Sequence, residues 1–597
     1  MNNKIKFALL TSAMTLSLAA CQDDWDDHYG QTADAPLGTA SLYEVMKSRP
    51  ELSDFCQVLA ETKIFANSRQ TSITYATLLS HDQFFTIWAP VNGSFNRDSL
   101  IEMCQTATGD SLVELHFVKN HVARYAHSVN GEEKNILMYN RKKINQGATT
   151  FNNIGFEATN IAARNGIVHV LKQAVPYYHN IYEAIIGLPE YAHIGNFLRK
   201  YQVDKLDESN SLAKGIVDGK TVYIDSVFVS GNSLLNDGWF GALQQEDSTY
   251  WMLMPTRELW DSLYAEALTY FNYGSVEKAD SLQLLYANDA LMMDLSYNMT
   301  SQWNWPTFAT STQFFYSSSS AYSQTQRIDM LNRHIYLDPQ EDGGIFDPNT
   351  WCGQQQCSNG WIYKIDRWPF QKEWTYFYPI RRDIENSSMT FDEGVKNKKL
   401  TVEVRSTADS RIYDNYISVT PQTQTDPYYV EFDVPDVLSG TYDIYVEFLP
   451  RYIDATLPFD EESTAGKRNR RSAKFSAEIT YRGTDGKSYT VNSKTRYKVD
   501  PENPAYYVKG TSADAYLFDC NVNPNASTRA FINDPFEVDP VKLCTMHFPT
   551  CSYALTEPTT RIRLTNAITN QETNKYWGVW FIDRVCFMPH IESETED

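Results

Sequence analysis

Residues 84–95 read FFTIWAPVNGSF, and residues 165–171 read NGIVHVL. The first stretch is a short apolar run that ends at Pro90, a pattern typical of a buried strand. The second begins with Asn165-Gly166, a pair that favours a tight type I′ hairpin turn. Its apolar residues then alternate between the two faces of a strand, and both faces are expected to be mostly buried. Together the two stretches predict a domain with buried central strands.

The same order of patterns recurs later in the chain, which indicates an internal repeat. A helix expected at residues 41–46 has its counterpart at 180–185. The strand and its proline recur as YWMLMPTRELW at 250–260, and the closing hairpin recurs as NGWIYKID at 359–366.

A histidine also stands at the end of a helical stretch in each copy, as His121 and His334. Such a residue could be a ligand or a switch. A residue that is present in both copies of a repeat is expected to have a structural role in the shared fold, because a binding site in one copy would not require it in the other. We therefore expect core histidines that hydrogen-bond to backbone.

This ordered set resembles the fasciclin family, with a first motif like TVFAPTNEAF, a central histidine and a second motif like NGVIHVID. Residues 86–95 and 165–171 match well, whereas the second copy is degenerate and carries insertions. The resemblance implies a compact α+β fold with about seven strands in a β-wedge and several helices. It also implies adhesion or binding, with no catalytic residues.

The C-terminal third has a different sequence pattern. Short stretches in which apolar and polar residues alternate are separated by Gly, Pro, Asn and Asp. This pattern predicts a β-sandwich. The stretches GTYDIYVEF at 440–448 and WFIDRV at 580–585 resemble a jelly roll of the galactose-binding or carbohydrate-binding type. Residues 461–471, rich in Arg and Lys, are expected to form a long exposed loop.

The N-terminus predicts an exported and anchored protein. Lys4 and Lys6 precede an apolar stretch too short to span a bilayer, which is typical of a secretory signal. Residues 18–21, LAAC, resemble a bacterial lipobox, which implies cleavage before Cys21 and its lipidation; an ordinary signal peptide with a chance cysteine is the alternative. Several acyl chains would hold the protein on a membrane.

The acidic run at 22–28 is typical of a solvated tether and also resembles the surface-export signal of Bacteroidetes lipoproteins, which would place the protein outside the outer membrane; the two readings do not exclude each other. The expected organisation is therefore multidomain, with α+β and all-β parts. It comprises a signal peptide at 1–20, an acidic tether at 21–40, a fasciclin-like domain at 41–179, a degenerate fasciclin-like domain with insertions at 180–372 and a β-sandwich at 373–597.

Composition excludes some classes of partner and site. A net charge of −22 argues against nucleic acid, which needs a basic face. Besides Cys21 there are eight cysteines, an even number that permits disulfides in an exported protein. Cys352 with Cys357, and Cys544 with Cys551, could close small loops, whereas zinc-binding spacing is not found.

Catalytic and metal-binding motifs are not found, so the expectation is no catalytic residue, no metal and no cofactor. Residues 109–112, GDSL, spell the block of an esterase family, but its downstream Asp-x-x-His is not found. Ser111 and Glu114 fit a capping box instead. The acidic segment 338–347 lacks regular calcium-loop spacing and is expected to be a polar turn.

These features predict a non-catalytic binding or accessory subunit on the outer membrane, facing the cell exterior. By resemblance, its partner would be a TonB-dependent transporter with a SusD-like lid lipoprotein (a SusCD-like pair) that imports glycans or peptides. Glycan is a possible direct ligand. The alternatives are a structural or adhesive subunit of an outer-membrane assembly and, third, a surface glycan hydrolase, since a pair of carboxylates has no sequence motif.

Overall fold

The structure is a computed structural model of the 597-residue chain. It describes residues 38–66, 69–217, 220–236, 242–299, 314–315, 336–337, 342–384, 400–409, 411–412, 415–504, 506–511, 517–522 and 529–591. Cys21 and the rest of the proposed signal and tether up to residue 37, together with His334, lie outside these ranges. In the described part, no helix has the length and apolar character needed to cross a membrane.

The chain divides into two compact units and is mixed α+β with many sheets. The first unit comprises Met1–Asn236, Ala242–Tyr250 and Gln355–Ile362, and the second comprises Asp237–Gly241, Trp251–Gln354 and Tyr363–Asp597. The domain boundaries expected at 179/180 and 372/373 remain predictions.

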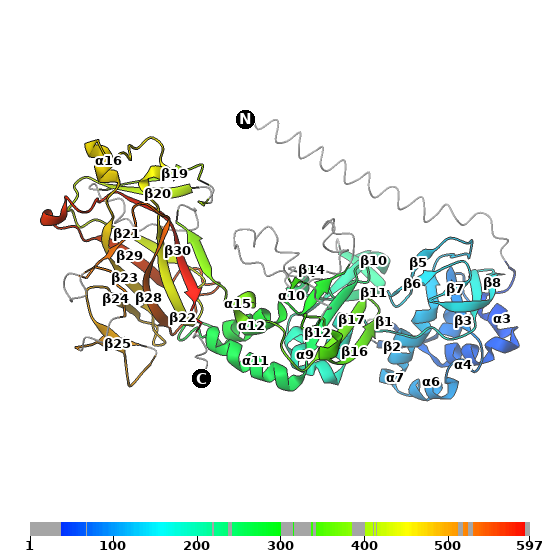
Figure 1. Ribbon diagram of the computed structural model, residues 1–597. Helices are drawn as coiled ribbons and strands as arrows, with labels where there is room; N and C mark the ends of the chain where they lie inside the picture. Colours follow the sequence, from blue (N-terminus) through cyan, green and yellow to red (C-terminus); the bar gives the residue numbers. More distant parts are fainter. Residues whose placement is uncertain are drawn as a thin grey trace. The chain divides into compact units, whose positions relative to one another are not determined.

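A seven-stranded sheet in the order β4-β3-β9-β8-β7-β6-β5 forms the centre of the first copy of the repeat (Figure 1). Strands β3 (Phe85–Pro90) and β9 (Gly166–Leu171) run parallel, and every residue of both is buried. The other strands of this sheet are β4 (Val122–Arg124), β5 (Lys134–Leu137), β6 (Lys143–Gln146), β7 (Thr150–Phe151) and β8 (Ile154–Ala163). The helices and the flanking hairpin are α3 (Leu42–Lys47), α4 (Ser53–Glu61), α5 (Tyr75–Leu78), α6 (Arg97–Met103), α7 (Ala107–Val113), β1 (Lys63–Ala66) and β2 (Arg69–Thr74).

The second copy repeats this order. Its sheet has the order β13-β12-β17-β16, and the helices that follow β12 are twice as long as α6 and α7. The elements are α8 (Ile181–Gly187), α9 (Ala192–Arg199), β10 (Gln202–Val217), β11 (Lys220–Asn232), α10 (Ser233–Asn236), β12 (Tyr250–Pro255), α11 (Arg257–Tyr270), α12 (Ala279–Met292), β13 (Ser296–Asn298), β14 (Phe314–Phe315), β15 (Tyr336–Leu337), β16 (Trp351–Cys357) and β17 (Gly360–Ile365).

A buried asparagine fastens the opening helix of the first copy to the strands. The side chain of Asn165 accepts a hydrogen bond from the backbone N–H of Leu42 (2.8 Å) and donates to the carbonyls of Leu79 (3.0 Å) and His81 (2.6 Å). The opening helix starts with a capping box, in which Ser41 and Glu44 satisfy each other's backbone N–H groups.

Asn359 makes the equivalent bonds in the second copy. It accepts from the N–H of Ile181 (2.9 Å) and donates to the carbonyls of Leu243 (2.8 Å) and Gln245 (2.9 Å). The helix that begins at Ile181 again has a capping box, formed by Asn180 and Glu183. The internal repeat is therefore confirmed at the level of individual hydrogen bonds.

The prediction of a type I′ turn at Asn165-Gly166 is wrong. Ala163 pairs with Gly166, so Arg164 and Asn165 form the turn, and neither has the positive φ that type I′ requires. Gly166 (φ +152°) is instead the first residue of β9, where a Cβ atom would lie 1.9 Å from the carbonyl oxygen of Phe85. Gly360 in the second copy has the same role against Tyr250, at 1.8 Å.

The C-terminal part is a sandwich of two antiparallel sheets, as the sequence predicts (Figure 1). One sheet has the order β19-β20-β30-β22-β28, with β18 also paired to β30; the other has the order β21-β29-β23-β24, with β27 paired to β23. Phe448 of β22 stacks on Phe475 of β23 (4.7 Å between centroids), and both contact Trp580 of β30, so these rings fill the space between the sheets.

The strands of the sandwich are β18 (Ile380–Asp383), β19 (Leu400–Ser406), β20 (Asn415–Pro421), β21 (Tyr429–Val434), β22 (Gly440–Phe448), β23 (Lys474–Arg482), β24 (Ser488–Asn492), β27 (Phe531–Ile532), β28 (Asp539–Phe548), β29 (Thr560–Asn566) and β30 (Trp580–Pro589). Short helix α15 (Lys372–Thr375) and hairpin β25 (Tyr497–Val499) with β26 (Tyr507–Lys509) complete this part. The expected exposed loop at 461–471 is wrong in its centre, which is helix α16 (Thr464–Asn469), capped by Ser463.

The capping role predicted for Ser111 is also wrong. Helix α7 begins earlier, because Thr106 accepts the hydrogen bond from the Gly109 N–H (3.1 Å) and acts as its N-cap. Ser111 therefore lies inside the helix. Glu114 is buried and accepts hydrogen bonds from the Phe65 N–H (3.2 Å) and the Tyr75 hydroxyl (3.0 Å).

The eight described cysteines are all free thiols, so the two small loops do not close. Cys352 and Cys357 lie five positions apart on strand β16 and on opposite faces of it, which separates them by about 16 Å. A disulfide requires Cα atoms about 4–7 Å apart.

Candidate binding pocket in the C-terminal sandwich

Four strands place polar side chains on the solvent-facing side of the β21-β29-β23-β24 sheet. Directly opposite residues on antiparallel strands share a face. Glu431 of β21 is opposite Arg563 of β29, Arg561 of β29 is opposite Thr480 of β23, and Arg482 of β23 is opposite Ser488 of β24. The alternate residues of these strands point into the sandwich core.

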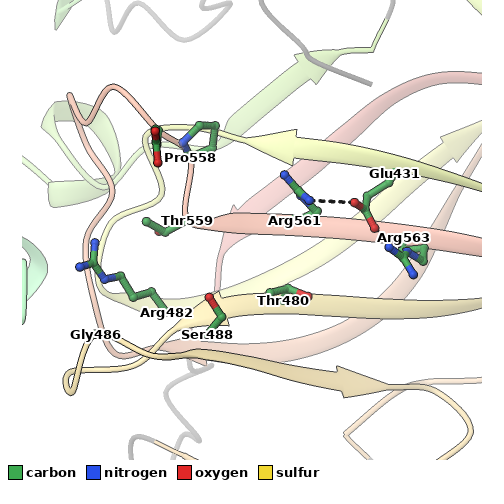
Figure 2. Close-up of a pocket in the computed structure, with 10 residues that line it drawn as sticks. Glu431, Thr480, Arg482, Gly486, Ser488, Pro558, Thr559, Arg561 and Arg563 are labelled. Atoms are coloured by element: carbon green, nitrogen blue, oxygen red, sulfur yellow. Dashed lines mark hydrogen bonds and ion pairs between the residues drawn. The ribbon is translucent and has the colours of Figure 1, made fainter. Parts of the chain in front are cut away.

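Glu431 is the centre of an ion-pair network in this surface (Figure 2). Its carboxylate accepts hydrogen bonds from Arg561 Nη1 (3.0 Å) and from Arg563 Nε, and its side chain is only 3% exposed. Arg561 Nε also donates to Asp433 Oδ1 (2.7 Å). Burial lowers the pKa of Arg563, but the hydrogen bond and charge of Glu431 outweigh it and raise the pKa above its ordinary value.

Arg482 differs from the other two arginines of the pocket. It is half-buried at the end of β23, and its guanidinium makes no ion pair in the described part of the chain. The nearby carboxylate of Asp485 pairs with Lys487 (3.1 Å) and accepts from the Tyr489 hydroxyl (3.0 Å). In Figure 2, Arg482 lies apart from the Glu431 network, on the same side of the pocket as Ser488.

These residues line a cavity of about 510 Å³. Eight of its ten lining residues end in a hydroxyl, carboxylate or guanidinium group; the other two are Gly486 and Pro558. Ligand pockets are commonly lined mostly by apolar side chains. This cavity therefore suits a hydrophilic ligand, which can hydrogen-bond to the walls.

The carboxylates of the pocket do not form an obvious acid and base pair. Both oxygens of Glu431 are held by arginines, and Glu557 is exposed on the loop before β29. A glycosidase needs one carboxyl group to protonate the leaving oxygen and a second to activate water or attack the sugar. The arrangement of Glu431 supports ligand binding better than proton transfer.

A second polar centre lies within the first unit, where the two copies of the repeat meet. Lys142, with a side chain 5% exposed, donates to Glu183 (2.6 Å), Glu246 (2.8 Å) and the Ser358 hydroxyl (3.2 Å). Lys142 belongs to the turn between β5 and β6 of the first copy, whereas its three partners belong to the second copy. This centre joins the copies.

An aromatic cluster lies beside Lys142. His116 stacks on Tyr177 (4.0 Å), which also faces His179 (5.2 Å). Burial and the neighbouring His179 lower the pKa of His116 to about 4.

The structure confirms the prediction that His121 is a core histidine. His121 is fully buried; its ring accepts a hydrogen bond from the Val175 N–H (2.9 Å) and lies 2.8 Å from the Phe117 carbonyl oxygen. Cys21 and His334 lie outside the described residues. Within the described ranges, no group of three or more His, Cys, Asp or Glu could hold a metal, and Asp347 caps a turn at the end of the acidic segment.

Sequence reasoning did not find the pocket or Lys142. Alternation of polar and apolar residues along each strand predicts a polar face that carries Glu431, Arg561, Arg563 and Thr480. Only the strand order, however, brings residues some 130 positions apart next to each other.

Comparison with known proteins gives only weak structural similarity. No protein-family model matches the chain, and no curated protein matches it. One similar solved structure holds the CBM22-1 and GH10 modules of a Clostridium thermocellum endo-1,4-β-D-xylanase with xylohexaose; it is 5% identical, with a TM-score of 0.18, and the match covers 36% of this chain and 29% of that one. Another is a FAS1 domain pair from the insect cell adhesion molecule Fasciclin I, 10% identical, with a TM-score of 0.16, covering 56% of this chain and 97% of that one.

Proposed function

We propose that this chain is a non-catalytic, lipid-anchored protein of the outer cell surface that binds a glycan in the pocket of its C-terminal sandwich. The observation that carries this proposal is the cavity of about 510 Å³ with its hydrogen-bonding walls. A sugar presents hydroxyl groups in every direction, and ion-paired arginines and glutamates offer them fixed donors and acceptors.

The rest of the chain has a supporting role in this proposal. The repeat with its paired asparagines would be two fasciclin-like domains, and the sandwich a jelly roll of the galactose-binding type. Lipidation of Cys21 would hold the chain on the outer membrane, and a TonB-dependent transporter with its SusD-like lid lipoprotein would be the partner. Support for the anchor is the LAAC sequence at 18–21.

The experiment is a combined binding and turnover assay on the purified mature chain. Isothermal titration calorimetry against a panel of oligosaccharides would report binding, and chromatography of the same samples after incubation would report cleavage. We expect at least one oligosaccharide to bind and none to be shortened. Cleavage would support the hydrolase alternative, and failure to bind any member of the panel would contradict glycan recognition.

A structural or adhesive role is the second candidate, and the Lys142 centre favours it. Within the first unit, a nearly buried lysine held by two carboxylates joins segments of the two repeat copies, a property useful for presenting a fixed surface. Deletion of the gene would then change the surface proteome and leave growth on every single glycan unchanged. A growth defect confined to one glycan would exclude this reading.

A further inference from the structure

We infer that the ligand of the sandwich pocket is an acidic glycan, and that Arg482 binds its carboxylate. This inference rests on the proposed glycan-binding function and specifies its substrate class. Three arginines line the cavity, and they differ in their partners.

Two of the three arginines already have carboxylate partners. Arg561 and Arg563 share Glu431, whose side chain is 3% exposed, and Arg563 also lies 4.3 Å above the ring of Tyr429. Their charge is neutralised inside the protein. They are positioned to fix the shape of the floor and to donate their remaining N–H groups to neutral oxygens.

Arg482 lines the same cavity but makes no ion pair in the described part of the chain. A half-buried guanidinium loses part of its hydration, and a bidentate carboxylate is the partner that restores those hydrogen bonds. The candidate carboxylate in its own hairpin, Asp485, is held by Lys487 and Tyr489. Arg482 is therefore available to a carboxylate from outside the chain.

The groups around Arg482 suit a sugar acid better than an acidic peptide. Ser488 is opposite Arg482 in the strand register, and Thr559 lines the same cavity, so hydroxyl groups flank the guanidinium. Acidic peptide motifs are recognised by clusters of arginines. In this pocket Arg561 and Arg563 are already paired with Glu431, so within the described part of the chain Arg482 stands as a single unpaired guanidinium, which suits one carboxylate flanked by hydroxyl groups.

Glu557 provides a matched test of the charge argument. It lines the pocket from an exposed loop and carries no ion pair in the described part of the chain. Its negative charge opposes an acidic ligand, so the variant Glu557→Gln should bind such a ligand at least as tightly as the wild type. For a neutral sugar, loss of a carboxylate acceptor should weaken binding instead.

The experiment uses pairs of oligosaccharides that differ only in charge. Trimers of galacturonate, glucuronate and mannuronate, and sialyllactose, would each be titrated beside the carboxyl-reduced form. The proteins would be the mature wild type, Arg482→Gln, Arg482→Lys, Glu557→Gln and, as a control, Lys494→Gln. Lys494 is exposed, lies just after β24 and does not line the pocket.

We expect one acidic member to bind the wild type about tenfold or more tightly than its reduced form, because a hydrogen-bonded charge is worth that much. Arg482→Gln should abolish the difference, Arg482→Lys should restore part of it, and Lys494→Gln should keep it. Added NaCl should weaken binding of the acidic form. Thermal unfolding of each variant would show that the fold is retained.

Two results would overturn the assignment. If acidic and reduced forms bind equally to the wild type, Arg482 does not select a carboxylate, although glycan binding stands. If the acid preference persists in folded Arg482→Gln, another group provides it. Failure of the wild type to bind any panel member would overturn the proposed function itself.

Discussion

At the residue scale, an asparagine followed by a glycine has the same role in each copy of the repeat. Asn165 and Asn359 each hydrogen-bond to three backbone groups in two separate segments. Gly166 and Gly360 allow a neighbouring carbonyl to approach closer than any side chain would permit. The sequence showed the Asn-Gly pairs but suggested a turn, because the distant partners of an asparagine cannot be read from its neighbours.

Replacement of this asparagine should be costly. In Asn165→Ala, buried backbone groups lose their partners, so the free energy of unfolding should fall by about 2–3 kcal/mol. Urea denaturation would measure the change, with Asn130→Ala as the control, since Asn130 is exposed and bonds only locally in the described structure. Equal stability of the two variants would contradict the anchoring role.

Buried neutral histidines should make stability depend on pH. Burial lowers the pKa of His121 and of His169 to about 4. Between pH 6.5 and 4 these two rings are therefore protonated in the unfolded chain but neutral in the folded chain. The free energy of unfolding should fall as the pH drops through this range. Between pH 7 and 5 each histidine should cost about 2 kcal/mol. His169→Gln should show a shallower pH profile than the wild type in urea titrations, and an unchanged profile would contradict this cause.

At the element scale, the sequence predicted the strands that carry strong patterns and missed the junctions between elements. Strands β3, β9, β12 and β17 lie where the apolar runs indicated. Helix α16 was missed because a short, charged segment has no apolar periodicity, and its cap at Ser463 was the available signal. The pocket and the Lys142 centre depend on pairing between distant elements, which a single sequence does not encode locally.

The Lys142 centre should stabilise the joined copies. In Lys142→Met, the carboxylates of Glu183 and Glu246 lose their counter-charge, and stability should fall by about 1–3 kcal/mol because the site is mostly buried. The double variant Lys142→Met/Glu246→Gln should recover part of this loss. The adjacent Lys143 pairs with Asp247 on the surface, so Lys143→Met should change stability by less than about 1 kcal/mol. Equal losses for Lys142→Met and Lys143→Met would show that burial of the pair is unimportant.

At the scale of the whole molecule, the account requires a membrane anchor. If Cys21 is lipidated, Cys21→Ser should move the protein from the outer-membrane fraction to a soluble fraction, because the acyl chains provide the membrane affinity. Fractionation followed by immunoblotting would measure this, and incorporation of labelled palmitate would be lost in the variant. Membrane retention of Cys21→Ser would show that something other than the lipid holds the chain.

The most direct test of the proposed role as a surface-binding accessory subunit is affinity purification of the tagged protein from detergent-solubilised membranes, with mass spectrometry of the co-purifying proteins. We predict a TonB-dependent transporter and its lid lipoprotein in stoichiometric amounts. Recovery of a barrel-assembly component, or of no partner, would contradict the accessory role and favour the structural or adhesive alternative.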